Sequence, residues 1–174
     1  MQNLNKFTEI VIITTGGTIE KTYDEFEGTL ENRGTMIKNK ISSKLRLPYT
    51  HFTVYPLLNK DSLYMDDEDR KLIVMTINDQ LKKKCPIVVL HGTDTMAVTA
   101  EKCFQEIKSL DVPVIFTGAM TPMGFEDTDA TQNVTEALLA AKLLPAGFYI
   151  SFHNQIFKVP NVRKNREKRT FEVC

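Results

Sequence analysis

Short apolar runs recur along the chain at intervals that leave room for a helix between them. The run from Ile10 to Ile13 and the run that ends at Leu90 contain no polar residue. A run without alternation of apolar and polar positions is typical of a parallel strand that is buried on both faces. We predict five strands, at residues 9–14, 51–56, 86–90, 112–116 and 147–152.

Between these runs, apolar residues recur every three or four positions, which is the spacing of an amphipathic helix. The first helix is predicted at residues 35–47 and ends before Pro48. The second begins with Asp66 or Asp67 as its cap and ends in a lysine run. The stripes that define the four predicted helices are Ile37, Ile41 and Leu45; Ile73, Ile77 and Leu81; Met96, Ala100, Cys103, Phe104 and Ile107; and Val134, Ala137, Leu138 and Ala141.

Strands that alternate with helices indicate an α/β fold. Right-handed helical crossovers between parallel strands place helices on both faces of the sheet. We therefore predict an open parallel sheet of the Rossmann or flavodoxin-like type, arranged as a three-layer sandwich. At 174 residues the chain is most simply one domain, residues 1–174.

Two stretches do not fit the alternation of strands and helices. Residues 20–33 are polar and acidic without clear periodicity, so they form either an active-site flap or a disordered insertion. We favour a mobile flap that is open without a ligand and closes over a bound one. Residues 156–164 are predicted to form a short extended excursion after the last strand.

The overall composition is that of a soluble globular protein, with 42% apolar and 25% charged residues. Lys and Arg together number 22, as do Asp and Glu, so the net charge gives no reason to expect a nucleic acid or an anionic membrane as partner. The one basic run, residues 163–169, is typical of a solvated surface.

The three cysteines form no CxxC pair, and their odd number argues against a complete disulfide framework. We therefore expect a reducing, cytoplasmic location. The amino terminus shows no secretory leader pattern, and no segment reaches membrane-spanning length. Three scattered histidines make no recognisable metal site, so neither a metal nor another cofactor is predicted.

The first predicted strand is followed by two threonines, two glycines and a third threonine, Thr18. Open α/β sheets bind ligands at the carboxyl ends of their strands. The glycines permit a sharp turn, and a hydroxyl here is a candidate nucleophile, for which we choose Thr18. A phosphate-binding loop or a dinucleotide site would need a different glycine pattern. The remaining alternative is a simple tight turn.

Two further strand-end loops present hydroxyls, Ser62 and Thr93, and Asp94 follows Thr93 directly. A threonine hydroxyl needs a neighbouring base to become a nucleophile, and a lysine held neutral by its surroundings can serve. Lys164, late in the chain, is the candidate. Taken singly, Asp94 could cap a helix, Ser62 could be a turn residue and Lys164 a surface cation.

Four motifs taken together favour a functional role for these residues. They are Thr15-Gly16-Gly17-Thr18-Ile19, Asp61-Ser62, His91-Gly92-Thr93-Asp94-Thr95-Met96 and Thr117-Gly118-Ala119-Met120. In order and spacing the chain resembles the bacterial-type L-asparaginase family, from the first strand to about Phe171. The resemblance implies the N-terminal α/β domain of that family.

The resemblance also implies a role for each matching residue. Thr18 would be the acyl-accepting nucleophile, Thr93, Asp94 and Lys164 a triad, and Tyr23 the flap tyrosine. Gly17 and Asp61 would line the substrate site. Ser62 would hold the substrate α-carboxylate, Asp94 its α-amino group, and the Ala119 N–H would contribute to an oxyanion hole.

The implied reaction is hydrolysis of the asparagine side-chain amide to aspartate and ammonia through an aspartyl-enzyme ester, with glutamine as a possible weaker substrate. The resemblance further implies a homodimer or a larger assembly. The alternative is a non-catalytic domain that binds or senses an amino acid. Both threonines are present together with Asp94 and Lys164, which favours catalysis, because a binder has no need of an activated nucleophile.

Overall fold

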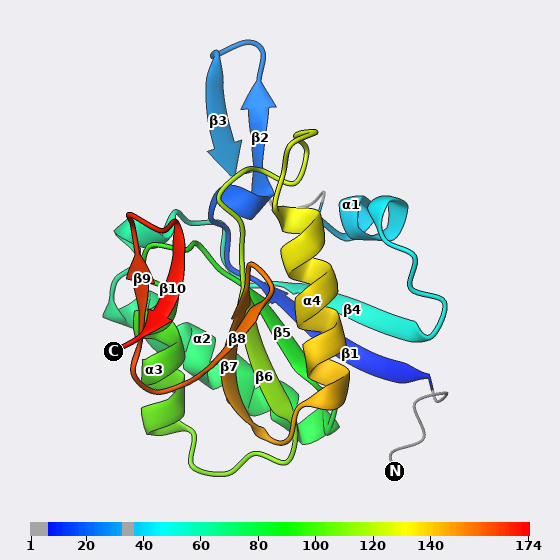
Figure 1. The fold of residues 1–174 in the computed structure, drawn as a ribbon, viewed down its shortest axis with the longest axis vertical. Coiled ribbons are helices and arrows are strands. Elements are labelled where there is room, and N and C mark those ends of the chain that lie inside the picture. The colour runs from blue at the N-terminus through cyan, green and yellow to red at the C-terminus, as the bar shows by residue number, and fades with distance from the viewer. Residues whose placement is uncertain (1–6, 33–36) are drawn as a thin grey trace.

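A six-stranded sheet forms the centre of the protein (Figure 1), in a computed structural model that describes residues 7–32 and 37–174. Its strand order is β4-β1-β5-β6-β7-β8. All neighbouring pairs are parallel except β7 and β8. The strands are β1 (Thr8–Thr14), β4 (Thr50–Pro56), β5 (Ile87–Leu90), β6 (Pro113–Thr117), β7 (Gly147–Phe152) and β8 (Gln155–Lys158).

Helices cover both faces of this sheet, as a three-layer α/β fold requires. The helices are α1 (Ile37–Lys44), α2 (Asp67–Gln80), α3 (Met96–Glu106) and α4 (Ala130–Leu143). Val11 and Ile13 of β1 point into a core with α2 and α3, while Ile10 and Ile12 point into a second core with α1 and α4. Figure 1 shows α4 in front of the sheet and α2 behind it. The predicted fold class is confirmed.

Local signals in the sequence account for the helix boundaries. Asp66 caps α2 in a reciprocal capping box with Asp69, so one of the two predicted caps is correct. The helix predicted at residues 35–47 is shorter, because α1 ends at Lys44, before Pro48. Residues 35 and 36 lie outside the described part of the chain.

The stretch predicted as a flap at residues 20–33 contains regular secondary structure up to residue 32. After the short 3₁₀ helix η1 (Thr18–Glu20), β2 (Lys21–Asp24) and β3 (Thr29–Asn32) form an antiparallel hairpin. Asp24 Oδ1 accepts hydrogen bonds from the N–H groups of Phe26 and Glu27, which stabilise the turn. The hairpin projects away from the sheet at the top of Figure 1. Its closure over a ligand stays a prediction.

The excursion predicted at residues 156–164 contains more regular structure than expected. β8 pairs antiparallel with β7, and the chain between them turns at His153 and Asn154, which both have positive φ. β9 (Val162–Asn165) and β10 (Thr170–Val173) then form a separate hairpin. β9 contacts α3, and its Lys164 reaches Thr93 in the loop after β5, so this hairpin lies beside the carboxyl end of that strand.

Candidate active site

Three strand-end loops meet at two glycines. A Cβ added to Gly17 would lie 2.5 Å from the Cα of Gly92, and a Cβ added to Gly92 would lie 2.5 Å from Ser62 Oγ. Gly17 also has φ 83°, a conformation that a side chain would strain. Only glycine therefore allows the loops after β1, β4 and β5 to approach this closely. They form the floor of the candidate site.

Thr18 begins η1 directly after this glycine turn and is half-buried. Its hydroxyl makes no hydrogen bond to any other residue in the described ranges. The backbones of Gly17 and Gly92 lie in contact. Thr18 and Thr93, the residues that follow these glycines, therefore lie on neighbouring loops. The arrangement leaves the Thr18 hydroxyl available to a ligand.

Thr93, Asp94 and Lys164 come together although 70 residues separate the lysine from the aspartate. The Lys164 ammonium donates to Thr93 Oγ1 at 2.8 Å and to Asp94 Oδ1 at 3.0 Å. The β9–β10 hairpin carries Lys164 to this place, where its side chain is 14% exposed. Arg166 of the same hairpin lies 2.9 Å from the same oxygen of Asp94. The predicted triad is thus spatially assembled.

Ser62 and Asp61 belong to the loop after β4. Ser62 is 1% exposed, and its hydroxyl has no hydrogen-bond partner in the described part of the chain. An unpaired buried hydroxyl is costly unless a ligand or a water molecule satisfies it. Asp61 pairs with Lys21 at 2.9 Å, and the hydrogen bond from Lys21 lowers the pKa of Asp61.

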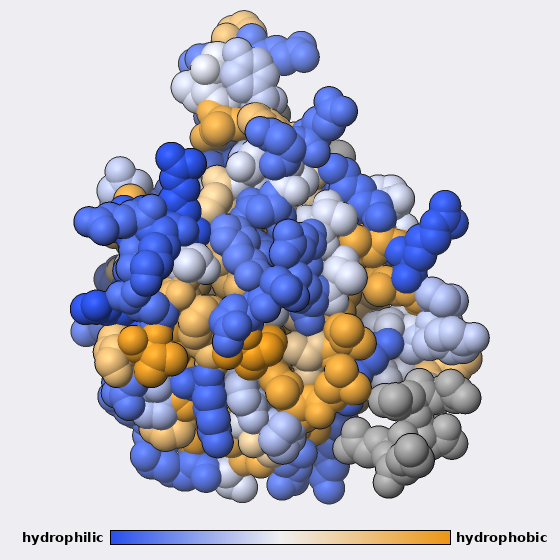
Figure 2. Space-filling model, in the orientation of Figure 1, coloured by the Kyte–Doolittle hydropathy of each residue, from blue (hydrophilic) through white to orange (hydrophobic). Residues whose placement is uncertain are grey.

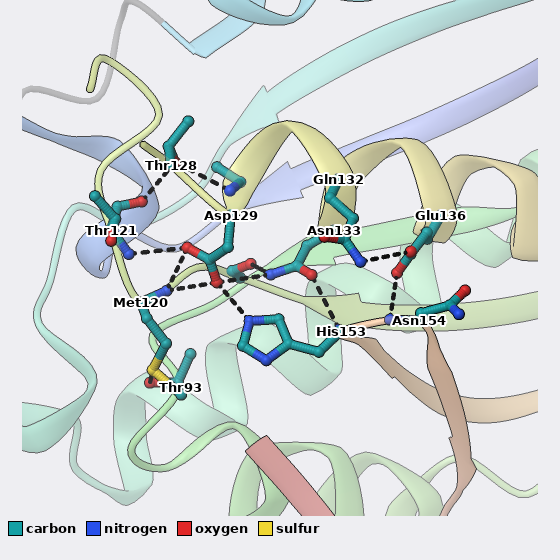
Figure 3. A network of polar contacts seen from close by, with 12 residues as sticks. Thr93, Met120, Thr121, Thr128, Asp129, Gln132, Asn133, Glu136, His153 and Asn154 are labelled. Carbon is teal, nitrogen blue, oxygen red and sulfur yellow. Dashed lines mark hydrogen bonds and ion pairs between the residues drawn. The ribbon is translucent and has the colours of Figure 1, made fainter. Parts of the chain in front are cut away.

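Ala119 follows β6, and the peptides on both sides of it are held by hydrogen bonds (Figure 3). Asn133 Nδ2 donates to Gly118 O at 2.9 Å, and the Met120 N–H donates to both oxygens of Asp129 at 3.0 Å. The Thr93 hydroxyl lies 3.8 Å from the sulfur of Met120, which connects this loop to the triad.

Sequence reasoning missed the residues that hold this loop, which are Asp129, Asn133 and His153. Asn133 is 0% exposed on a helix face that it shares with the apolar Ala137, four residues later. A polar residue on an apolar stripe was the available signal.

His153 Nε2 donates to Asp129 Oδ2 at 2.8 Å. Burial alone would raise the pKa of Asp129, but the hydrogen bonds from Met120, His153 and Thr121 bring it below the usual value.

His91 is completely buried beneath the loop that carries Thr93. Burial lowers the pKa of His91 to about 4, so the imidazole is neutral at physiological pH. Its Nδ1–H donates to Gly92 O at 2.8 Å. This contact supports the backbone of the loop.

Glu20 is a buried carboxyl at the end of η1, 3% exposed. The Gly16 N–H donates to Glu20 Oε2 at 2.6 Å. Burial raises the pKa of Glu20 from 4.5 to about 7, although the Gly16 N–H favours the charged form. The turn before Thr18 is therefore hydrogen-bonded to a group that changes charge near neutral pH.

We expect Glu20→Gln to remove part of the pH dependence of stability. The pKa of Glu20 is about 7 in the folded chain and near 4.5 in the unfolded chain. Between these values the folded chain binds more protons, so the free energy of unfolding falls as the pH rises through this window. The complete pKa shift of Glu20 corresponds to roughly 3 kcal/mol of unfolding free energy. Above about pH 8, Glu20→Gln is therefore expected to be more stable than the parent by at most this amount.

Urea unfolding of parent and variant at about pH 5 and about pH 8 measures this difference. Glu25→Gln, at an exposed glutamate of the adjacent hairpin, is the control. A stability difference between Glu20→Gln and the parent that stays constant over this range would contradict the assignment.

Tyr23 lies on β2, 58% exposed, and makes no described contact with Thr93, Asp94 or Lys164.

Within residues 7–32 and 37–174, no group of three or more His, Cys, Asp or Glu side chains is arranged to hold a metal ion. No helix of the described ranges has the length and apolar character needed to cross a membrane.

Comparison with known proteins extends these observations. A family model described as asparaginase, N-terminal, matches residues 9–172. An L-asparaginase from Thermococcus kodakarensis is 28% identical over 158 residues, which are 90% of this chain and 47% of that protein. L-asparaginase 1 from Escherichia coli is 30% identical over 158 residues, or 86% and 45% of the two proteins. A 60 kDa lysophospholipase from Mus musculus is 30% identical over 141 residues, or 80% and 25%.

The fold comparison gives the same result. The solved structure of the thermostable L-asparaginase from Thermococcus kodakarensis matches with a TM-score of 0.87 at 26% identity, over 95% of this chain and 51% of that chain. The chain spans about half the length of the L-asparaginases that it matches. Because the family model covers almost the entire sequence, the chain belongs to the asparaginase family and corresponds to the N-terminal domain of its members.

Proposed function

We propose that the protein hydrolyses the side-chain amide of L-asparagine to L-aspartate and ammonia, with Thr18 as the nucleophile. The observation that carries the proposal is the contact of Lys164 Nζ with both Thr93 Oγ1 and Asp94 Oδ1, at 2.8 and 3.0 Å. A lysine that reaches a hydroxyl and a carboxylate together is the arrangement needed to move a proton at that hydroxyl.

In the proposed reaction the Thr18 oxygen attacks the amide carbon and gives up its proton as the new C–O bond forms. The C–N bond then breaks, and the nitrogen leaves as ammonia after gaining a proton. Water attacks the resulting ester, releases aspartate and restores the Thr18 hydroxyl. We assign proton movement to Thr93 and Lys164, and stabilisation of the developing oxyanion to the N–H groups of Thr93 and Ala119.

We assign substrate binding to the groups around the glycine floor. The unpaired Ser62 hydroxyl is suited to an α-carboxylate, and Gly17 lets the backbone approach the ligand. Asp61 and Asp94 are suited to an α-ammonium. Asp61 is already paired with Lys21, and Asp94 is paired with both Lys164 and Arg166. A bound ammonium therefore competes with Lys164 and Arg166, which contact the same oxygen of Asp94. The role of Tyr23 in a closed hairpin stays a prediction.

Ammonia release in the presence of asparagine, glutamine or buffer tests the proposal directly. Release above buffer with asparagine supports hydrolysis, and its ratio to glutamine measures the preference. Binding of asparagine without ammonia release would instead favour a domain that binds or senses an amino acid. That alternative is weaker, because Lys164 contacts a hydroxyl that a binding site has no reason to activate.

We also propose a homodimer or a larger assembly. Figure 2 shows hydrophobic side chains gathered over the lower part of α4 and the neighbouring strands. Leu139 and Leu143 are 55% and 51% exposed, and they line a cleft of about 230 Å³ with Ile156. Exposed apolar patches often mark interfaces between proteins.

Light scattering at micromolar concentration is expected to give at least twice the mass of the chain. Leu139→Lys with Leu143→Lys should reduce that mass, whereas Val98→Lys, at an exposed apolar residue of α3, should not. A monomeric parent would contradict this proposal.

The proposed cytoplasmic location is consistent with the three free cysteines. The interpretation of residues 1–174 as one domain stays a prediction.

A further inference from the structure

A buried amide lies at the centre of the network in Figure 3, and the mechanism proposed above does not use it. Asn133 is 0% exposed at the start of α4. Its Nδ2 donates to Gly118 O at 2.9 Å and to Asp129 Oδ2 at 3.0 Å, and its Oδ1 accepts from the His153 N–H at 3.1 Å. Rotating the amide by half a turn would place Oδ1 against two acceptors. These three bonds therefore fix its orientation.

The bond to Gly118 O has a direct effect on Ala119, because the two groups belong to one peptide. The peptide is planar and, in its trans form, its N–H points opposite to its C=O. Fixing the direction of Gly118 O thus fixes the direction of the Ala119 N–H. A hydrogen bond accepted by the carbonyl also polarises the peptide and makes its N–H a stronger donor.

The following peptides are fixed by the same network. The N–H groups of Met120 and Thr121 donate to the carboxylate of Asp129 at 3.0 Å. His153 and Asn133 both donate to that carboxylate, so it is oriented from several sides. The backbone from Gly118 to Thr121 therefore has little freedom to rotate. Such rigidity is what a donor aimed at a developing charge requires.

We propose that Asn133 is a positioning residue that aims and strengthens the Ala119 N–H as an oxyanion donor. The expected effect of Asn133 on kcat rests on the proposed amidohydrolase function. Its structural content, a polarised Ala119 N–H, is independent of that function. Asp129 and His153 act through Asn133 and through the neighbouring peptides.

Asn133→Asp is the most informative variant, because it keeps the shape and replaces the amide donor with a carboxylate oxygen. We expect kcat for asparagine to fall by ~10-fold to ~100-fold near pH 8, with KM changed less than about threefold. The matched control is Asn78→Asp, the same substitution at an exposed residue of α2, on the other face of the sheet. Its kcat should equal that of the parent.

The pH profile separates positioning from general structural support. Protonation of the introduced carboxyl restores a donor that can face Gly118 O, and the nearby Asp129 carboxylate raises its pKa. The ratio of variant to parent kcat should therefore rise as the pH falls from about 8 to about 5. A ratio independent of pH, together with parallel losses in KM and thermal stability, would overturn the positioning role.

A nuclear magnetic resonance measurement tests the inference without activity. The nitrogen-15 and proton shifts of the Ala119 amide respond to the hydrogen bond accepted by Gly118 O. They should move in Asn133→Asp and remain unchanged in Asn78→Asp. Unchanged Ala119 shifts in both variants would overturn the inference even if the parent is active. A parent that releases no ammonia while these shifts do move would contradict the proposed function alone.

Discussion

Replacing Thr18 with valine is expected to lower ammonia release from asparagine by about 10⁴-fold or more, the scale of loss seen when a covalent nucleophile is removed. The reason is that the hydroxyl is half-buried beside the glycine floor, has no described partner, and is the proposed site of the ester. Valine keeps the shape of the side chain and removes only the attacking oxygen. Steady-state and single-turnover ammonia assays measure the loss.

Asparagine binding should survive in Thr18→Val, because the proposed contacts at Ser62 and Asp94 are untouched. Calorimetry of variant and parent should give dissociation constants within about threefold, which corresponds to less than 1 kcal/mol. Thr22→Val, the same substitution on the adjacent hairpin, is the control for activity. If Thr18→Val hydrolyses asparagine at the parent rate, the threonine nucleophile is wrong for this protein.

Replacing Lys164 with methionine is expected to lower kcat by about 10³-fold, since this one side chain contacts both Thr93 and Asp94. Groups that act as a unit give non-additive losses. Combining Lys164→Met with Thr18→Val should therefore be hardly worse than Thr18→Val alone. Initial rates of ammonia release for the four proteins measure this coupling.

Folding should tolerate the loss of Lys164. Asp94 keeps its ion pair with Arg166, so the substitution leaves no unpaired carboxylate. Lys168→Met is the matched control on the same hairpin, because Lys168 is 70% exposed and pairs with Glu172. A Lys164→Met protein that keeps both its thermal midpoint and the parent kcat would exclude a role for Lys164 in proton movement.

The parts of the fold that were predicted correctly are those in which local sequence and burial agree. Ile10 to Ile13 read as a strand buried on both faces, and all four side chains are at most 4% exposed. β8 lacked this signal, because only Phe157 of its four residues is buried. The β2–β3 hairpin buries little, so its apolar pattern is weak, and its turn residues Asp24 and Gly28 were the available signal.

The candidate site could be predicted where a residue lies in the loop after a predicted strand, as Thr18, Ser62 and Thr93 do. Lys164 was placed by resemblance, since sequence spacing does not determine where a second hairpin folds back. Asn133 could not be assigned, because its role depends on three partners spread from Gly118 to His153. Contacts of that kind exist only after the helix has packed on the sheet.

The contact of Gly17 with Gly92 limits how the candidate site can change. A side chain added at Gly17 would clash with the backbone of Gly92, and one added at Gly92 would clash with the side chain of Ser62, which is itself enclosed. Variation in the candidate site is therefore expected mainly among its exposed neighbours. Leu63 and Tyr64, which follow Ser62, are 59% and 76% exposed, and the side chain of Arg166, which pairs with Asp94, is 71% exposed. A library aimed at new substrates should leave the glycines fixed and randomise these three outer positions.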